Sequence, residues 1–289
     1  MLSSLTMEVS DQELGMFINT LRQASDYDFS EYSDKSLRRR IAKILVDHKM
    51  SLPQLLQTIE QERDFAEKIV REITVNTTEL FRDPQVWHML RYKVLPLYAH
   101  LPVINIWDIG CSTGQEVYSL LILLNELGLF EKTNVYATDI NSEVLTAASK
   151  GVYRYRFNIN YLDNFDKVIR ENPYNTAIHY DVPYEKYFEI DKNRDLIRMK
   201  PFLTSKPVFR KHNLVQQGNI WLRKFDLIFC RNVIIYFNFN LQNKVFKTFH
   251  DSLQEAGCLV LGLHESILGP FSSHFEKKDM VYFIKNPLP

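Results

Sequence analysis

The segment from Val103 to Gly114, which reads VINIWDIGCSTG, ends in a glycine-bearing turn that could hold a nucleotide-like ligand. Gly110 and Gly114 allow a backbone to approach a ligand without an intervening Cβ atom. A helix that starts after this turn offers free N–H groups to an anionic group. A second predicted strand ends at Asp139, where a carboxylate can accept hydrogen bonds from ribose hydroxyls. The pattern therefore predicts a site at the carboxyl ends of parallel strands.

The spacing of the glycines restricts the ligand. The turn reads G-x-x-x-G without a lysine, so it matches neither the dinucleotide pattern G-x-G-x-x-G nor the phosphate-loop pattern. This favours a ligand that has a ribose but no pyrophosphate, such as S-adenosylmethionine. The turn alone leaves open a nicotinamide site, or a turn without a special ligand. Asp139 could also serve as a helix N-cap, a role that is compatible with ligand binding.

Alternating strands and helices must position this turn. Short apolar strands are expected at 103–109, 135–138, 225–230, 258–263 and 280–284, and helices at 116–127, 142–149 and 241–253. This alternation is typical of a doubly wound α/β fold with a parallel sheet. Between Gly151 and Lys206 the alternation stops, and strand-like pieces at 177–180, 187–190 and 196–199 predict a small antiparallel insertion. Arg231 and Asn232 follow the strand at 225–230 and should reach the same rim as Gly110.

The N-terminal stretch has a helical pattern instead. Helices are expected from Ser10-Asp11 onward, over 35–49, from Ser51 onward, and over 62–74. On the second helix, four cations lie on one face: Lys35, Arg38, Arg39 and Lys43. Leu37, Ile41, Ile44 and Leu45 lie on the opposite face, which should pack on the other helices. The basic face is expected to point outward and to bind an acidic partner.

Composition restricts the class of protein. The chain has 289 residues, 45% of them hydrophobic, and a formal net charge of zero, which argues against a general nucleic-acid-binding protein. The three cysteines have no paired or metal-like spacing, and no apolar run approaches the length of a membrane span. Met1 to Ser10 has no apolar core of a signal peptide. We expect a cytoplasmic protein without membrane insertion, metal or nucleic-acid partner, acting as a monomer.

Four blocks of sequence, in order, resemble one known family. They are NTTELFRDP from Asn76, CSTGQEVYS from Cys111, ATDIN from Ala137, and FDLIFCRNVIIYF from Phe225. Together they are similar to the chemotaxis receptor glutamate methyltransferases, the CheR family, from about residue 10 to the C-terminus. The resemblance implies a Rossmann-like class I S-adenosylmethionine-dependent methyltransferase with a small all-helical N-terminal domain and an inserted antiparallel β-subdomain. The expected boundaries are 1–75 for the helical domain, 76–100 for the linker and first helix, 101–289 for the methyltransferase domain, and about 175–202 for the β-subdomain.

The resemblance also assigns roles to residues. It implies cofactor contacts for Asn76, Thr78, Arg82, Glu116, Asp139, Asn213, Leu214, Arg231 and Asn232. Gly110 joins this set because of the turn chemistry given above. Arg82 and Tyr236 are implied beside the reacting groups. The implied partner is the cytoplasmic domain of a methyl-accepting chemoreceptor, whose glutamate-rich helices would bind the basic face.

Some positions depart from the family pattern. The acidic pair after the glycine turn is Gln115-Glu116, Val117 replaces a common proline, and the residues near the last strands read His264-Glu265-Ser266. The long aromatic stretch over 158–184 leaves open whether a receptor tether docks on the β-subdomain.

The implied reaction needs little acid–base chemistry. A glutamate side chain is already ionised at pH 7, because its unperturbed pKa is about 4.3. Alignment of the reacting atoms is the main requirement, with Arg82 as candidate cation and Tyr236 as candidate hydroxyl. The simpler interpretations remain: Arg82 as a surface arginine, Tyr236 as a core aromatic, and Glu116 as a first-turn residue that favours the helix dipole.

Other functions remain open beside this one. They are an S-adenosylmethionine-binding scaffold without catalysis, a methyltransferase of a sensory pathway other than chemotaxis, a methyltransferase for small molecules, and a nicotinamide-dependent oxidoreductase.

Overall fold

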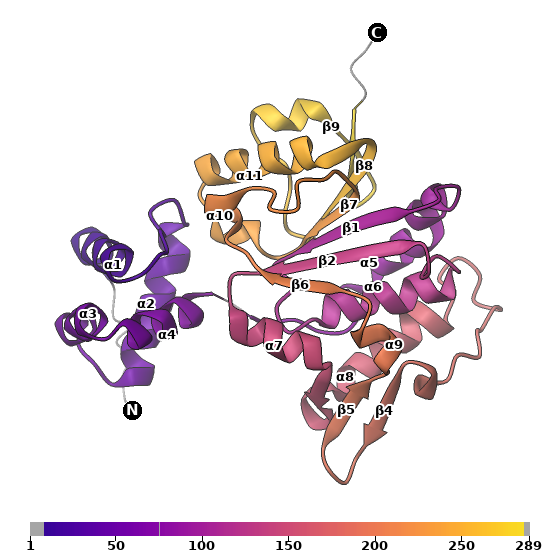
Figure 1. The fold of residues 1–289 in the computed structure, drawn as a ribbon, viewed down its shortest axis with the longest axis horizontal. Helices are drawn as coiled ribbons and strands as arrows, with labels where there is room; N and C mark the ends of the chain where they lie inside the picture. Colours follow the sequence, from indigo (N-terminus) through magenta and orange to yellow (C-terminus); the bar gives the residue numbers. More distant parts are fainter. Residues whose placement is uncertain (1–8, 75, 286–289) are drawn as a thin grey trace. The chain divides into compact units, whose positions relative to one another are not determined.

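The computed structural model describes residues 9–74 and 76–285. The chain forms two compact units. The first contains the N-terminal residues up to 75 together with Val233–Gln242, and the second contains Asn76–Asn232 and the residues from Asn243 onward (Figure 1). Residues 1–8, 75 and 286–289 lie outside the described residues, so the expected boundary at 75/76 stays a prediction.

Four helices form most of the first unit: α1 (Asp11–Ala24), α2 (Asp34–His48), α3 (Leu52–Gln61) and α4 (Arg63–Ile73). The starts of two of them are fixed by reciprocal caps, Ser10 with Glu13 and Ser51 with Gln54. Each cap satisfies donors that the first turn leaves unpaired. The predicted apolar face of α2 is buried, which confirms the helical period of that segment.

The first unit also includes a segment far along the chain. It comprises the 3₁₀ turn η5 (Ile234–Tyr236) and the start of α11 (Phe239–Ser252). Phe237 forms an antiparallel bridge with Tyr32, just before α2. Gln242 on α11 donates from Nε2 to the carbonyls of Ile234 and Phe237, at 3.1 and 3.0 Å, which ties the turn to the helix.

The second unit contains a seven-stranded sheet in the order β6-β2-β1-β7-β8-β10-β9. The strands are β1 (Ile104–Ile109), β2 (Thr133–Asp139), β6 (Val208–Lys211), β7 (Phe225–Cys230), β8 (Leu253–Leu261), β9 (Phe275–Lys278) and β10 (Val281–Ile284). The first five in spatial order are parallel, while β10 and β9 are antiparallel to their neighbours. The expected α/β class is confirmed. A purely parallel sheet was wrong for the last predicted strand, and β6 and β9 were not predicted.

The core of this unit lies largely on one face of the sheet. Ile104, Ile106, Leu227 and Phe229 pack there against two helices, α5 (Pro84–Met89) and α6 (Gln115–Glu126). Beyond α5 the chain continues as a π-helical turn, η1 (Leu90–Val94), and a 3₁₀ turn, η2 (Leu95–Tyr98). On the opposite face, the Trp107 ring contacts Phe225 and His212. Both faces of the central strands are therefore covered, which suits the largely apolar sequence of β7, FDLIFC.

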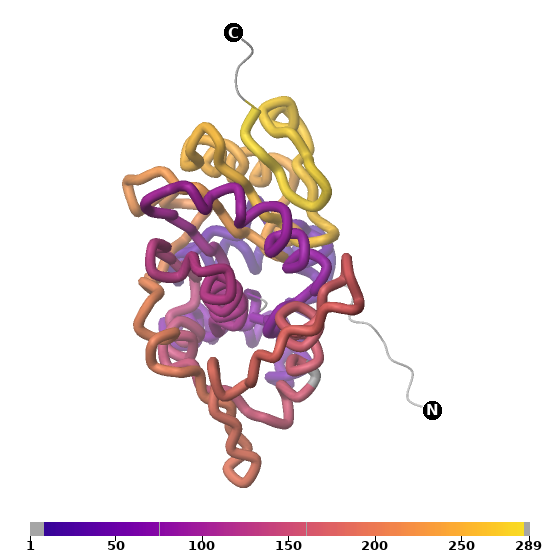
Figure 2. The backbone as a smooth tube through the Cα atoms, turned by 90° about the vertical axis from the view of Figure 1, so that its right-hand side faces the viewer, coloured from indigo at the N-terminus to yellow at the C-terminus, as the bar shows by residue number. Residues whose placement is uncertain are grey.

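The insertion differs in part from its prediction. Its three-stranded sheet has the order β3-β5-β4, with β3 (Val152–Arg154), β4 (Phe188–Asp191) and β5 (Leu196–Met199). Residues 177–180 are not a strand and have only one bridge, between His179 and Glu171. The unpredicted helix α8 (Tyr155–Phe165) and π-turn η3 (Asp166–Arg170) precede them, followed by the short turn η4 (Tyr184–Lys186). Figure 2 shows the β4–β5 hairpin projecting from the rest of this unit.

Short elements complete the second unit: α7 (Ser142–Lys150), α9 (Pro201–Thr204), α10 (Leu214–Gln217) and η6 (Pro270–His274). Among the residues that the structure describes, no helix has both the length and the apolar character that a membrane span requires.

Candidate functional site

The glycine turn between β1 and α6 has a backbone that few side chains tolerate. Gly110, Ser112 and Gly114 have φ angles of 75°, 51° and 91°. The amides of Gly110 and Cys111 both donate to the carbonyl of Thr138, at 2.7 and 3.0 Å, so the turn is attached to the end of β2. A Cβ on Gly114 would lie 2.9 Å from the Cβ of Ala148. Glycine is therefore required there by both conformation and space.

Asp139 stands at the end of β2 and faces this turn. Its Oδ2 accepts from the amide of Ser112 and its Oδ1 from the amide of Asn141, both at 2.9 Å. Burial raises the pKa of Asp139, and these backbone donors act against that rise. A carboxylate has about four acceptor positions, so each oxygen can accept another hydrogen bond. The N-cap of α7 is Asn141, whose side chain accepts from Glu143, so the N-cap alternative for Asp139 was wrong.

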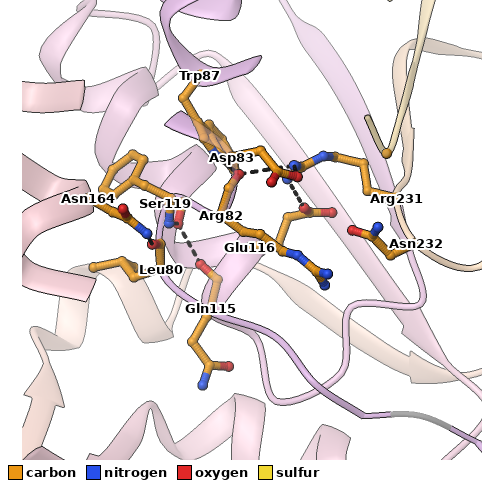
Figure 3. Close-up of polar contacts among 12 residues, drawn as sticks. Leu80, Arg82, Asp83, Trp87, Gln115, Glu116, Ser119, Asn164, Arg231 and Asn232 are labelled. Carbon is orange, nitrogen blue, oxygen red and sulfur yellow. Dashed lines mark hydrogen bonds and ion pairs between the residues drawn. The ribbon is translucent and has the colours of Figure 1, made fainter. Parts of the chain in front are cut away.

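Arg231, at the end of β7, has a side chain that is only 1% exposed. Its Nη1 lies 2.5 Å from Oε2 of Glu116, and its Nη2 lies 2.8 Å from Oδ2 of Asp83. The same Nη2 donates to the carbonyl of Arg82 at 3.0 Å. Figure 3 shows this guanidinium between the two carboxylates. Glu116 is therefore more than a first-turn residue, since it is half of a buried ion pair.

A third acid lies near this pair. Asp108 in β1 is fully buried, and neither of its carboxylate oxygens has a hydrogen-bond partner among the described residues. Burial raises the pKa of Asp108 well above its usual range, and repulsion from Glu116 raises it further, while Arg231 opposes the shift. Sequence reasoning did not single out Asp108 or Asp83. The position of Asp108, two residues before the glycine of the turn, was the signal in the sequence that could have identified it.

The segment Asn76–Asp83 lies against the glycine turn and α6. The hydroxyl of Ser112 donates to the carbonyl of Asn76 at 3.0 Å, and the amide of Phe81 donates to the hydroxyl of Ser119 at 2.7 Å. Phe81 and Asp83 both adopt left-handed φ angles, 50° and 58°. These contacts attach both ends of the segment that carries Thr78 to the glycine turn and α6, and the cofactor roles of Thr78 and Arg82 stay predictions.

Arg82 itself is half-buried, and its Nη1 donates to the carbonyl of Thr77 at 3.4 Å. In Figure 3 its guanidinium extends to the same region as the side chains of Glu116 and Asn232. The role of Arg82 in a site stays a prediction.

Asn232 has a left-handed φ of 61°, which asparagine tolerates better than most residues. Oε2 of Glu265 accepts from the amides of Asn232 and Gly262, both at 2.7 Å. A Cβ on Gly262 would lie 2.7 Å from that oxygen. Glu265 therefore fixes the turn after Arg231. It belongs to the His264-Glu265-Ser266 segment, which differs from the family pattern.

Asn213 and Leu214 follow β6 on the other side of Asp139. The amide of His212 donates to the carbonyl of Asp139 at 2.8 Å, and Asn213 caps α10 by accepting from Val215 at 3.2 Å. Leu214 is buried. The predicted cofactor residues of the second unit thus come from the ends of adjacent strands, the turn after β1, the first turn of α6 and the segment Asn76–Asp83. Their contacts with a ligand stay a prediction.

The remaining predicted residues belong to the first unit. Tyr236 is half-buried in η5. On α2, Lys35, Arg39 and Lys43 are exposed, and Lys43 pairs with Asp47 at 2.5 Å. Arg38 does not extend freely as predicted, because it binds the carboxylate of Asp11 and the carbonyl of Val9 near the start of α1. Arg38 therefore binds the start of α1 within its own unit.

The residues of the second unit fit S-adenosylmethionine by their chemistry. Asp139 retains acceptor positions for two ribose hydroxyls, and the carboxylates of Glu116 and Asp83 share the one guanidinium of Arg231. Two carboxylates around one cation suit a ligand with a cationic end. Within the described part of the chain, no group of three or more metal-ligating side chains is found.

Comparison with known proteins gives matches over nearly the whole chain. The model described as "CheR methyltransferase, SAM binding domain" matches residues 76–167 and 169–284, and "CheR methyltransferase, all-alpha domain" matches residues 12–74. A Pseudomonas putida protein named as a methyltransferase is 33% identical over 92% of this chain and 93% of its own length. "Chemotaxis protein methyltransferase 1" of Vibrio cholerae is 29% identical over 90% of this chain and 91% of its own length. The protein of the same name from Pseudomonas aeruginosa is 32% identical, over 75% and 76%.

Proposed function

Because the chain belongs to the CheR methyltransferase family, we propose that it methylates glutamate side chains of a chemoreceptor, with S-adenosylmethionine as donor. The observation that carries the proposal is Asp139, a buried carboxylate with spare acceptor positions beside a strained glycine turn. A dinucleotide enzyme would need its pyrophosphate-binding pattern at that turn, and the sequence lacks it.

The cofactor, when bound, supplies a methyl group on a sulfonium. When a carboxylate oxygen takes this methyl group, the sulfur–methyl bond breaks and the neutral thioether S-adenosylhomocysteine is the leaving group. Asp139 would hold the ribose, and Glu116 with the acids around Arg231 would hold the cationic end. Asn76, Thr78, Asn213 and Leu214 would border the remaining parts. Of these side chains, those of Asp139, Glu116 and Asn213 are fixed by the hydrogen bonds described above.

The substrate carboxylate needs no general base, because it is ionised at pH 7. Arg82 would orient that carboxylate, since a planar guanidinium matches two carboxylate oxygens. The hydroxyl of Tyr236 would donate a hydrogen bond to the substrate carboxylate beside its reacting oxygen. The work of the enzyme is then alignment, which contributes about 7–11 kcal/mol in well-oriented systems.

The test is methyl transfer to receptor membranes from a radiolabelled donor, followed by release of volatile methanol in base, which marks a carboxyl ester. Asp139→Ala should abolish donor binding and transfer. Asp226→Ala is a matched control, because Asp226 is equally buried and also accepts from a backbone amide, at 2.8 Å, near the start of β7. Equal losses in both variants, or label that is stable to base, would contradict the proposal. Donor binding without transfer to any receptor would favour a scaffold.

The receptor would bind the exposed cations of α2. Replacing Lys35 and Arg39 by alanine removes two exposed charges, each worth about 0.5 kcal/mol, so KM for the receptor should rise about fivefold at low salt. Replacing Arg63 and Lys68 by alanine removes the same charge from α4 of the same unit and should leave KM unchanged. Equal effects of the two pairs would refute a docking role for α2.

We further propose that the enzyme acts as a monomer in the cytoplasm, where it meets the cytoplasmic domain of its receptor. Sedimentation of the purified chain and fractionation of cells test these two statements directly.

A further inference from the structure

Tyr236 is held by a strip of chain that belongs to the N-terminal helices. The strip is Glu31–Ser33, which immediately precedes α2. The amide of Ser33 donates to the carbonyl of Tyr236 at 2.8 Å, and the amide of Asn238 donates to the carbonyl of Glu31 at 2.9 Å. These two bonds flank the bridge between Tyr32 and Phe237. The backbone on both sides of Phe237, beginning at the carbonyl of Tyr236, is thus fixed as in an antiparallel ladder.

Aromatic packing reinforces this ladder. The ring of Tyr32 meets that of Phe237 edge-on, with centroids 5.1 Å apart, and that of Phe29 at 4.7 Å. Phe29 and Phe237 are 2% and 5% exposed, so Tyr32 connects two buried rings. Such pairs contribute beyond the area that they bury.

We propose that Tyr32, with its strip Glu31–Ser33, is a positioning residue that sets the orientation of Tyr236 for methyl transfer. This inference rests on the proposed function for the role of Tyr236. A turn of three residues has few internal bonds of its own, so its orientation depends on what binds it from outside. Small displacements of a group that aligns reactants are costly, because about 1 Å can lower a rate a hundredfold.

The first measurement separates rate from binding. Tyr32→Ala should lower kcat between tenfold and a hundredfold, while Kd for the donor and KM for the receptor stay within twofold. Tyr32→Phe keeps the ring and should restore kcat. Leu55→Ala is the control, because Leu55 is fully buried in the same unit and belongs to α3 and not to the strip. Its kcat should be unchanged below its melting temperature. An equal fall of kcat in Tyr32→Ala and Leu55→Ala would overturn the proposal.

The second measurement is a double-mutant cycle with Tyr236→Phe. If Tyr32 acts through Tyr236, adding Tyr32→Ala to Tyr236→Phe should lower kcat no further. Losses that multiply would overturn the proposal.

Hydrogen exchange tests whether Tyr32 holds the strip in place, and this test needs no measurement of enzyme activity. The amides of Ser33 and Asn238 should be protected in the wild type and should exchange at least tenfold faster in Tyr32→Ala, but not in Leu55→Ala. Unchanged exchange would overturn the positioning role. Failure of the wild type to methylate receptors, with this exchange pattern intact, would instead contradict the proposed function.

Discussion

The buried guanidinium of Arg231 provides a sharp test of how the second unit is held together. Arg231→Met keeps much of the side-chain volume but removes the charge that Glu116 and Asp83 share. The two acids then repel each other and lose a donor each. Asp108 loses the one neighbour that lowers its pKa.

The size of the loss follows from burial. Removing one partner of a buried ion pair costs about 3–5 kcal/mol, because the other charge is left uncompensated. The side chains of Glu116 and Asp83 are 13% and 25% exposed, so water recovers part of that cost. We expect the free energy of unfolding of the second unit to fall by about 3 kcal/mol, near the lower end of the range.

Tryptophan fluorescence in a urea titration measures this unit selectively. The three tryptophans, Trp87, Trp107 and Trp221, all belong to the second unit. Arg223→Met is the matched control, since Arg223 is exposed and stacks on Tyr136, so it should cost less than about 1 kcal/mol. A loss in Arg231→Met no larger than in Arg223→Met would refute the reasoning, because the ion pairs would then contribute no more than surface charges.

Two further predictions concern the glycine turn and Asp108. Gly114→Ala should abolish donor binding and cost more stability than Gly128→Ala in thermal melts, since both have positive φ but only the Gly114 Cβ would meet Ala148; equal costs would contradict this. Asp108→Asn should have a stability advantage over the wild type that grows with pH. Burial and Glu116 raise the pKa of Asp108 in the folded protein, so its contribution to stability is complete below its unfolded pKa, about 3.9, and is lost as pH rises through the folded value. A difference between Asp108→Asn and the wild type that is constant from pH 4 to 8 in urea titrations would contradict that shift.

Much of the fold could be predicted where local signals were complete. The helices α1 and α3 start at serines whose caps are readable from sequence, and β7 is a largely apolar run, with Asp226 as its one charged residue, that has its predicted ends. The strands β6 and β9 were missed because they have little buried surface of their own. Val208 is 49% exposed, and three of the four residues in β9 are exposed. Such strands are specified by the neighbours they pair with.

In the candidate site, too, local features could be predicted from the sequence and contacts between distant segments could not. Gly110, Gly114 and Asp139 were readable because turn chemistry and strand ends are local properties. The pairing of Arg231 with Glu116 joins residues 115 positions apart, so it could not be read from either segment. The engagement of Arg38 by the start of α1 likewise depends on how two helices pack. The unpartnered carboxyl of Asp108 appears only once the surrounding chain is in place.

The discontinuous composition of the first unit has a consequence for biosynthesis. Residues up to 75 leave the ribosome early, but Val233–Gln242 emerge only after Asn76–Asn232 of the other unit have been made. Domains usually fold in the order of their synthesis. The four helices must therefore wait with an incomplete surface, where Tyr32 lacks the aromatic partner that Phe237 later supplies. A nascent chain stalled before Val233 should accordingly be a better client for chaperones than one stalled after Gln242.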